Sequence, residues 1–550
     1  MTPPPSSESN DVVGTRTPLL RAPPFSRADA SVTRPRANPP INLTSDSIDR
    51  VFAAIRAAGV GGPFWAPQHH HTGATAILRG RSVAEIEKAR TILTEPQHPG
   101  PLWIPSTEAI DPWPLLRGGA TLIAHGDDEW VALAVIASVP LHILSSGRFG
   151  SPGDHTDRLR EIVAKDLMRV NYRDPFTMRE TDIEATVALL ADWRRMFEAN
   201  RQIVAACGFS WWKRREIERF LWTPEHPLRF FRSERRALAY AARHSGAAAV
   251  WPSRVSGGIA VAAAAKNVPL IRVEDGFIRS VGLGSNLVPP SSVVVDRRGI
   301  HYDPGQPSDL ETLLANADFP PALLARAARM RTMILKAGIS KYGSDAVQAF
   351  PPRKAGGRLV LVPGQVEDDM SVRLGGGGVT SNLELLRRAR VLEPDAEIWF
   401  RPHPDVNAGH RKGAVREIDA LEHADRIIQG GGMASLLDRV DAVHVLTSLT
   451  GFEALLRGRE VACHGTPFYA GWGLTRDFAA VPDRRGRQLT LDELVAAVLI
   501  VYPRYLDPVT GLPCAPEVLI RRMEEGAAHN RLGWVTRLRR MQGRLLRRRA

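Results

Sequence analysis

The segment DAVHVLTSLTGFEALLRGREVACHG, residues 441–465, sets the pattern for the C-terminal half of the chain. A short apolar run leads into hydroxyl residues, then an amphipathic stretch, then a second apolar run. The short runs predict buried strands, and the stretch between them predicts a helix. Strand, helix and strand in this order predict two parallel strands of one sheet.

The same alternation extends outward in both directions. From about residue 230, the runs AAAVW, VPLIRV and SSVVV alternate with helical stretches, and RLVLVPG and EIWFRPHPD do so after the segment PPRKAGG (351–357). Apolar strands alternating with amphipathic helices predict an α/β fold whose parallel sheets are covered on both faces. Two such sheets joined at PPRKAGG predict a ligand cleft between the C-terminal edges of their strands.

Composition and patterning divide the chain into five expected segments. We expect a disordered segment rich in Pro, Ser, Thr and Arg at 1–45, a small α/β domain at 46–150, a helical lead-in with the first sheet domain at 151–352, the second sheet domain at 353–520, and a basic amphipathic tail at 521–550.

The small α/β domain at 46–150 contains an echo of the opening segment. Without gaps, residues 123–139 align with residues 445–461, so that Ser448 falls opposite Gly126 and Thr450 opposite Asp128. If this domain is a degenerate repeat, two aspartates stand at its helix N-terminus and would repel a phosphate. We therefore expect a structural role for this domain.

Charge, cysteine content and the absence of long apolar runs exclude several classes of protein. Basic residues exceed acidic ones by 72 to 59, giving a net charge of +13. Three widely spaced cysteines exclude a disulfide framework and a zinc site of the CxxC kind. No secretory signal and no run of about 18 apolar residues is present, so we expect a cytoplasmic protein.

The tail 531–550 carries eight arginines and no acidic residue. Its leucines recur at roughly helical spacing, which predicts a peripheral contact with an anionic inner-membrane surface; a solvated basic tail is the alternative. No recognised nucleic-acid motif accompanies the charge, so no specific nucleic-acid partner is expected.

Polar residues follow two predicted strands of the second sheet domain. Arg401, His403 and Pro404 stand where the strand EIWF ends, and an arginine and an imidazole there can bind a phosphate. A rigid turn with a satisfied histidine is the alternative. Gln365 ends the strand RLVLVPG at the same expected edge.

A third strand leads into LTSLTGFEALL. Ser448, Thr450 and Gly451 lie at the first turn of the predicted helix, where free N–H groups and the helix dipole form an anion site. Ordinary helix capping is the alternative. Glu453, one turn in, could accept a hydrogen bond from a ribose hydroxyl or from its own helix cap.

In the first sheet domain the stretch RVEDGFIRSVGLGSN (272–286) follows the strand VPLIRV. Glu274 and Asp275 leave the end of that strand, and Arg279 nearby would keep Asp275 ionised as a nucleophile or general base. A capped turn with a surface ion pair is the alternative. The Gly-Leu-Gly is too short for a dinucleotide-binding GxGxxG pattern, which disfavours a dehydrogenase.

Together, VEDGFIRSVGLGS, PGQVEDD, RPHPDV, LTSLTGFEALLRG, GTPFYAGWGLT and YPRYLDPVTGLPC resemble, in order and spacing, the bacterial capsule polysaccharide biosynthesis proteins. Those are retaining β-Kdo glycosyltransferases of GT-B type, with two Rossmann-like domains facing a cleft. The resemblance covers roughly residues 205–520. It implies transfer of Kdo from CMP-Kdo, without a cofactor or a required metal, to a Kdo-bearing lipid-linked acceptor in capsule linker synthesis.

The resemblance also implies roles for particular residues. Asp275, with its neighbour Glu274, would be catalytic, and His403 would bind the CMP phosphate and assist its departure. Ser448 and Thr450 would hold the same phosphate. Independently of the resemblance, Arg279, with Ser280, is a candidate for binding the acceptor or a substrate carboxylate. The sequence leaves open a covalent or a front-face route to retention.

Other functions remain open at this point. A GT-B transferase for another CMP-activated acidic sugar, or a non-catalytic capsule export or assembly factor, would carry the same pattern. A second Kdo transferase and the capsule export machinery are further expected partners.

Overall fold

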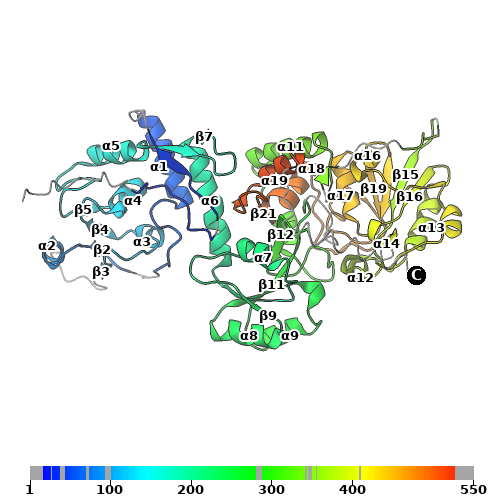
Figure 1. Ribbon diagram of the computed structural model, residues 1–550, viewed down its shortest axis with the longest axis horizontal. Helices are drawn as coiled ribbons and strands as arrows, with labels where there is room; N and C mark the ends of the chain where they lie inside the picture. Colours follow the sequence, from blue (N-terminus) through cyan, green and yellow to red (C-terminus); the bar gives the residue numbers. More distant parts are fainter. Residues whose placement is uncertain are drawn as a thin grey trace, which may run out of the picture. The chain divides into compact units, whose positions relative to one another are not determined.

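The computed structural model describes residues 17–26, 28–36, 44–69, 73–92, 101–279, 288–340, 343–344, 350–354, 356–407 and 411–526. Ser280 and the predicted membrane-binding tail 531–550 lie outside the described residues. Contacts divide the chain into two compact units. Unit 1 comprises Met1–Asn200 with Thr223–Glu225, and unit 2 comprises Arg201–Trp222 with His226–Ala550 (Figure 1).

Unit 1 is built on a parallel four-stranded sheet of order β3-β2-β4-β5. Its strands are β2 (Ala76–Arg79), β3 (Leu102–Trp103), β4 (Thr121–Ala124) and β5 (Leu141–Ile143), and its helices are α1 (Ser45–Ala58), α2 (Val83–Ile92), α3 (Trp113–Leu116), α4 (Glu129–Ala137), α5 (Thr156–Leu167) and α6 (Ile183–Asn200). An antiparallel sheet of β1 (Thr33–Pro35), β6 (Val170–Arg173) and β7 (Glu180–Thr181) completes the unit. In strand order 2-1-3-4, the topological switch point lies between β2 and β4.

The expectation of disorder over residues 1–45 is wrong for the part that the structure describes. Strand β1 pairs with β6, Leu20 is fully buried, and the rings of Phe25 and Trp193 meet edge to face at 5.1 Å. A few apolar anchors among the prolines and serines are enough to hold this segment on unit 1.

Residues 151–200 also belong with unit 1 by their contacts, and not with the first sheet domain. On α6, Arg194 forms an ion pair with Asp111, and Glu198 accepts a hydrogen bond from Gln68 at 2.9 Å. These polar contacts join α6 to loops beside the unit 1 sheet. The helical pattern of residues 151–200 alone did not predict these contacts.

The first half of unit 2, here the β11 half, is built on a seven-stranded sheet of order β22-β21-β12-β11-β10-β8-β9. Its strands are β8 (Ile203–Cys207), β9 (Arg229–Phe231), β10 (Ala247–Val250), β11 (Leu270–Asp275), β12 (Ser292–Asp296), β21 (Pro503–Leu506) and β22 (Pro513–Cys514), and its helices are α7 (Arg214–Phe220), α8 (Glu234–Arg243), η1 (Pro252–Arg254), α9 (Ile259–Ala264), α10 (Asp309–Asn316), α11 (Pro321–Lys336) and α19 (Pro516–Glu524). Strands β9, β8, β10 and β11 are parallel, so the switch point lies between β8 and β10. A small ribbon pairs β13 (Ile339–Ser340) with β14 (Gly343–Ser344).

The second half of unit 2, here the β15 half, is a parallel six-stranded sheet of order β17-β16-β15-β18-β19-β20. Its strands are β15 (Leu359–Pro363), β16 (Glu397–Arg401), β17 (Arg426–Ile427), β18 (Ala442–Val445), β19 (Glu460–Cys463) and β20 (Arg476–Asp477), and its helices are α12 (Met370–Gly375), α13 (Asn382–Leu392), α14 (Pro404–Asn407), α15 (Glu417–Leu421), α16 (Met433–Leu437), α17 (Leu449–Leu456), α18 (Leu491–Val495) and η3 (Ala496–Val501). In chain order this is 3-2-1-4-5-6, the Rossmann order, and its switch point lies between β15 and β18.

Residues 353–520 were expected to form the second sheet domain. After η3, however, the chain returns to the β11 half. Strand β21 pairs antiparallel with β12, with Tyr505 opposite Ser292. The hydroxyl of Tyr502 donates to Asp296 at 2.7 Å, and both groups are buried. Pairing to a distant strand overrides the local pattern here.

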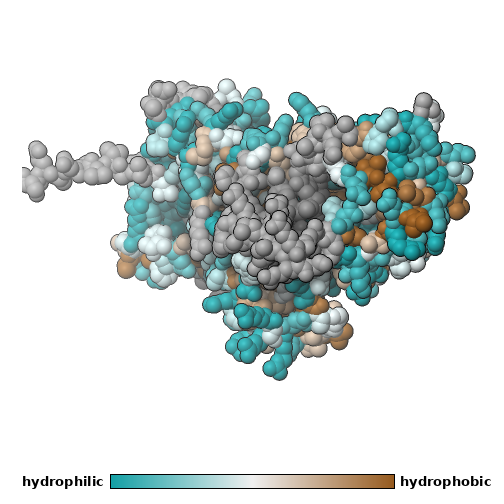
Figure 2. All heavy atoms as spheres, turned by 45° about the vertical axis from the view of Figure 1, so that its right-hand side comes forward, coloured by the Kyte–Doolittle hydropathy of each residue, from teal (hydrophilic) through white to brown (hydrophobic). Residues whose placement is uncertain are grey.

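The predicted fold class is confirmed: this is an α/β, GT-B-like protein with two Rossmann-like sheets and an N-terminal α/β extension. Among the residues that carry a hydropathy colour in Figure 2, most on this face are hydrophilic, and apolar residues gather over the β15 half. In the part of the chain that the structure describes, no helix is long and apolar enough to cross a bilayer.

Candidate functional site

Asp275 ends β11 at the carboxyl edge of its sheet and is bound by two cations. Its Oδ1 lies 3.0 Å from Nζ of Lys213, and its Oδ2 lies 2.8 Å from Nε of Arg279. A Cβ on Gly276 would collide with the side chain of Ser292, so only glycine allows the chain to turn directly after the carboxylate.

These cations decide the charge of Asp275. Burial opposes ionisation, but the ion pairs with Arg279 and Lys213 hold the pKa of Asp275 well below its usual range. Burial lowers the pKa of Lys213, while the charge of Asp275 opposes that shift. Arg279 is 1% exposed, and its Nη2 donates to the carbonyl of Val288 at 2.9 Å, so it braces Asp275 from the protein side.

Glu274 has the opposite environment. Burial and the adjacent negative charge of Asp275 raise the pKa of Glu274 to about 7. One Glu274 oxygen accepts the backbone N–H of Asp275 at 3.1 Å. The charge of Asp369, from the β15 half, also raises this pKa, so the two halves meet electrostatically at Glu274. Two adjacent carboxyls with separated pKa values are suited to different proton roles.

In the β15 half, Gln365 joins the two strands of the switch point. Its amide donates to Oγ1 of Thr447 at 3.1 Å and accepts the Thr447 N–H at 2.9 Å. Its own backbone N–H donates to Asn382 at 2.8 Å. Gln365, predicted to bind the donor, therefore fixes the loop that leads into α17.

Ser448 is the N-cap of α17. Its hydroxyl oxygen accepts the N–H of Thr450 at 3.2 Å, and its carbonyl accepts the hydroxyl of Tyr469. Any Cβ on Gly451 would collide with Tyr469, which explains the glycine. Glu453 is buried one turn further in. The Ser448 hydroxyl also donates to Oγ1 of Thr450 at 3.1 Å, so the two hydroxyls bond each other at the first turn of α17, at the switch point.

Arg401 and His403 lie at the end of β16, on the same edge of the sheet as the N-terminus of α17, and β15 lies between β16 and β18. The Asp405 N–H donates to Nδ1 of His403 at 3.2 Å, which places the proton of a neutral ring on Nε2. Arg401 donates to the carbonyl of Gly431, and Pro404 begins α14. The sheet order therefore brings four predicted residues of the β15 half, Gln365, Arg401, His403 and Ser448, to one edge.

A run of packed aromatic rings links the acidic motif to the α17 cap. The ring of Phe277, two residues after Asp275, lies 4.7 Å from that of Phe468. Phe468 contacts Tyr469 edge to face at 5.0 Å, and Tyr469 bonds the carbonyl of Ser448. Phe468 and Tyr469, both in the segment GTPFYAG, therefore connect the loop after Asp275 to the N-terminus of α17.

Lys213 and Trp251 have no role that the sequence pattern predicts. Nζ of Lys213 lies 3.4 Å from the centre of the Trp251 ring, and both residues follow strands at the β8–β10 switch point. The signal was the basic, aromatic stretch SWWKRR directly after a buried strand. The strand order, which the sequence does not display, is what brings it to Asp275.

Side chains of unit 1 itself occupy the switch point of its sheet. Asp128 caps α4 by accepting the N–H of Trp130 at 3.0 Å. Nε of Arg79, at the end of β2, lies 2.7 Å from Asp128, and both side chains are buried. Structurally Asp128 corresponds to Ser448 as a cap, so the gapless alignment that set Asp128 against Thr450 is two residues out of register.

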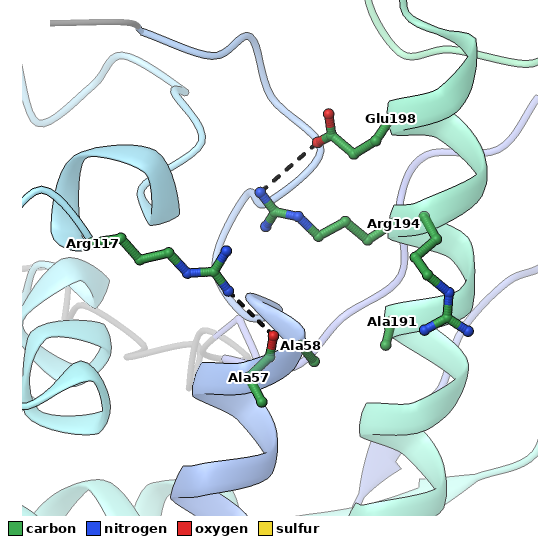
Figure 3. Close-up of a pocket in the computed structure, with 7 residues that line it drawn as sticks. Ala57, Ala58, Arg117, Ala191, Arg194 and Glu198 are labelled. Atoms are coloured by element: carbon green, nitrogen blue, oxygen red, sulfur yellow. Dashed lines mark hydrogen bonds and ion pairs between the residues drawn. The ribbon is translucent and has the colours of Figure 1, made fainter. Parts of the chain in front are cut away.

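Unit 1 also holds a cavity of about 500 Å³ lined by three arginines, three alanines and Glu198, which forms an ion pair with Arg194 (Figure 3). Arg117 donates to the carbonyls of Arg56 and Ala57 at the C-terminus of α1, and Arg194 pairs with Asp111. The Arg117 guanidinium satisfies carbonyls at the end of α1, and the Arg194 guanidinium belongs to a buried ion pair. We therefore interpret the arginines of this cavity as stabilising unit 1.

Comparisons with known proteins single out the region that holds the site. A family model described as capsule polysaccharide biosynthesis protein matches residues 247–505. The capsule polysaccharide modification protein LipA of Neisseria meningitidis serogroup A is 39% identical over 370 residues, 66% of this chain and 52% of LipA. The lipopolysaccharide-processing protein LpsZ of Rhizobium meliloti is 46% identical over 244 residues, 44% of this chain and 55% of LpsZ. The chain thus spans about half the length of these relatives.

Among solved structures, the β-Kdo 2,4 transferase of KpsC from Thermosulfurimonas dismutans is 33% identical, with a TM-score of 0.50. The match covers 59% of this chain and 98% of that one. The relative is covered almost whole, and the family model spans the acidic motif, the His-Pro turn and the α17 cap. The chain belongs to the capsule polysaccharide biosynthesis family.

Proposed function

We propose that this chain transfers Kdo from CMP-Kdo to a Kdo-bearing, lipid-linked acceptor with retention of configuration. The observation that carries the proposal is Asp275, an ionised carboxylate held by two cations in the same unit as the helix terminus at the Rossmann switch point. The likeness to a β-Kdo transferase supports the choice of sugar.

In this proposal the β15 half binds the nucleotide. The phosphate of CMP lies at the first turn of α17, where Ser448, Thr450 and the helix dipole meet an anion. Nε2–H of His403 donates to the phosphate and helps it depart, and Arg401 adds positive charge. Gln365 acts by holding the Thr447 loop.

The β11 half carries the transfer. Asp275 attacks the anomeric carbon and CMP leaves; Glu274 takes the proton of the acceptor hydroxyl, which then displaces Asp275. A carboxyl with a pKa near 7 is matched to this proton transfer at neutral pH.

The test is incubation of the purified protein with CMP-Kdo and a Kdo-lipid mimic, followed by mass spectrometry. One added Kdo per acceptor supports the proposal. Transfer from CMP-sialic acid but not from CMP-Kdo would assign another acidic sugar. Turnover of neither donor would leave a non-catalytic capsule assembly factor and would overturn the proposal.

A further inference from the structure

Lys213 lies outside the region matched by the family model and at the switch point of the β11 half. Its Nζ sits 3.4 Å from the centre of the Trp251 ring and 3.0 Å from Oδ1 of Asp275. Lys213 is 7% exposed and lies at the switch point, where parallel α/β sheets bind their ligands. This position suggests a role in binding a ligand in addition to a role in folding.

Among the residues that the structure describes, Asp275 forms ion pairs with both Lys213 and Arg279, whose side chains are buried. One carboxylate is therefore shared between two cations. Losing that negative charge would leave both ion pairs broken in a buried site, which is costly.

The proposed reaction removes the negative charge that Lys213 and Arg279 share. When an oxygen of Asp275 bonds to the anomeric carbon, the bond from that carbon to the CMP phosphate oxygen breaks, and its electron pair leaves with CMP. Asp275 is then an uncharged ester, and Lys213 and Arg279 lose their shared counter-charge. A 2-keto acid sugar carries a carboxylate on this same carbon, whereas a neutral aldose carries hydrogen there.

We propose, on the basis of the function proposed above, that Lys213 selects donor sugars with a carboxylate on the anomeric carbon. Its ammonium pairs with Asp275 in the resting site and with the sugar carboxylate once the charge of Asp275 is consumed. Arg279 is held by the Val288 carbonyl as well as by Asp275, whereas Lys213 has a flexible stem and a ring face beneath its ammonium.

The experiment compares CMP-Kdo with its neutral carboxamide analogue as donors for the wild type, Lys213→Met and Lys266→Met. Lys266 is an exposed lysine of the same half and serves as the matched control. We expect the wild type and Lys266→Met to prefer the carboxylate donor strongly in kcat/KM. Lys213→Met should lower that preference about 10- to 100-fold, the size of one charge-assisted hydrogen bond. A folded, active Lys213→Met with an unchanged preference overturns the proposal.

Failure of the two proposals can be told apart. If the wild type transfers sugar from neither donor, the proposed function is wrong. If it transfers sugar from both donors equally well, only the proposed role of Lys213 is wrong. If Lys213→Met does not fold by circular dichroism, Trp251→Leu takes its place, because it keeps the lysine and removes the ring beneath it. A preference lowered about threefold or more supports the proposal, and an unchanged preference contradicts it.

Discussion

Unit 1 and the β15 half contain the same strand–helix–strand element with opposite chemistry at its switch point. In β4–α4–β5 the cap is Asp128, and in β18–α17–β19 it is Ser448; each accepts the backbone N–H two residues on. Across the switch point, Asp128 meets Arg79 in a buried ion pair, whereas Thr447 meets the neutral Gln365. In unit 1 this local fold therefore forms a closed ion pair, and in the β15 half we propose that it forms an anion site, with the charge of the cap making the difference.

The largest expected effect follows from removing the charge of Asp275. Asp275→Asn should lower transfer about 10³-fold or more, because an amide is neither a nucleophile nor a base here. Mass spectrometry of the product measures this. Asp127→Asn in unit 1 keeps an acceptor oxygen for the Arg148 N–H and should change transfer less than about twofold. Equal losses in both variants would contradict the division of labour between the units.

Breaking the unit 1 ion pair should cost stability and leave the chemistry intact. Asp128→Ser keeps a helix cap but strands Arg79, which should destabilise unit 1 by about 3–5 kcal/mol. Hydrogen–deuterium exchange of β4 and α4 measures the loss. Glu87→Gln removes an exposed pair with Arg90 and should cost less than about 1 kcal/mol. Full protection in Asp128→Ser would show that the pair does not hold this unit together.

The His-Pro turn should contribute to nucleotide affinity. His403→Ala should weaken CMP binding by about 1.5–3 kcal/mol, the value of one hydrogen bond to a charged group, as measured by calorimetry. His423, which precedes β17 at the amino edge of the same sheet, provides the control variant His423→Ala. If CMP affinity is unchanged in His403→Ala, the turn is structural, like the arginines of unit 1.

The smallest effect is a pH dependence at Glu274. Because the pKa of Glu274 is raised to about 7, the ionised form that can accept a proton is lost as pH falls below neutrality. We expect kcat/KM to fall about tenfold per pH unit on that side. Glu274→Gln should be slow and lose this dependence. A wild type with a flat profile from about pH 5.5 to 8.5 would remove Glu274 as the base.

The sequence predicted the edge positions of Asp275, His403 and Ser448, because strands that alternate with helices are parallel and their carboxyl ends meet. It could not predict the meeting of Lys213 with Asp275, which depends on β8 and β11 flanking β10. The return of β21 to the first sheet, like the packing of β1 on β6, depends on partners far away in the chain. Non-local pairing is what local patterns leave out.

We propose that the cap of α17, and not that of α4, receives the nucleotide. Calorimetric titration of the wild type and of Ser448→Asp with CMP separates these two sites, because aspartate caps a helix as well as serine but repels a phosphate. We expect one CMP per wild-type chain and at least about a tenfold weaker affinity in Ser448→Asp, with an unchanged melting temperature. Two CMP per chain, or full affinity in Ser448→Asp, would contradict it.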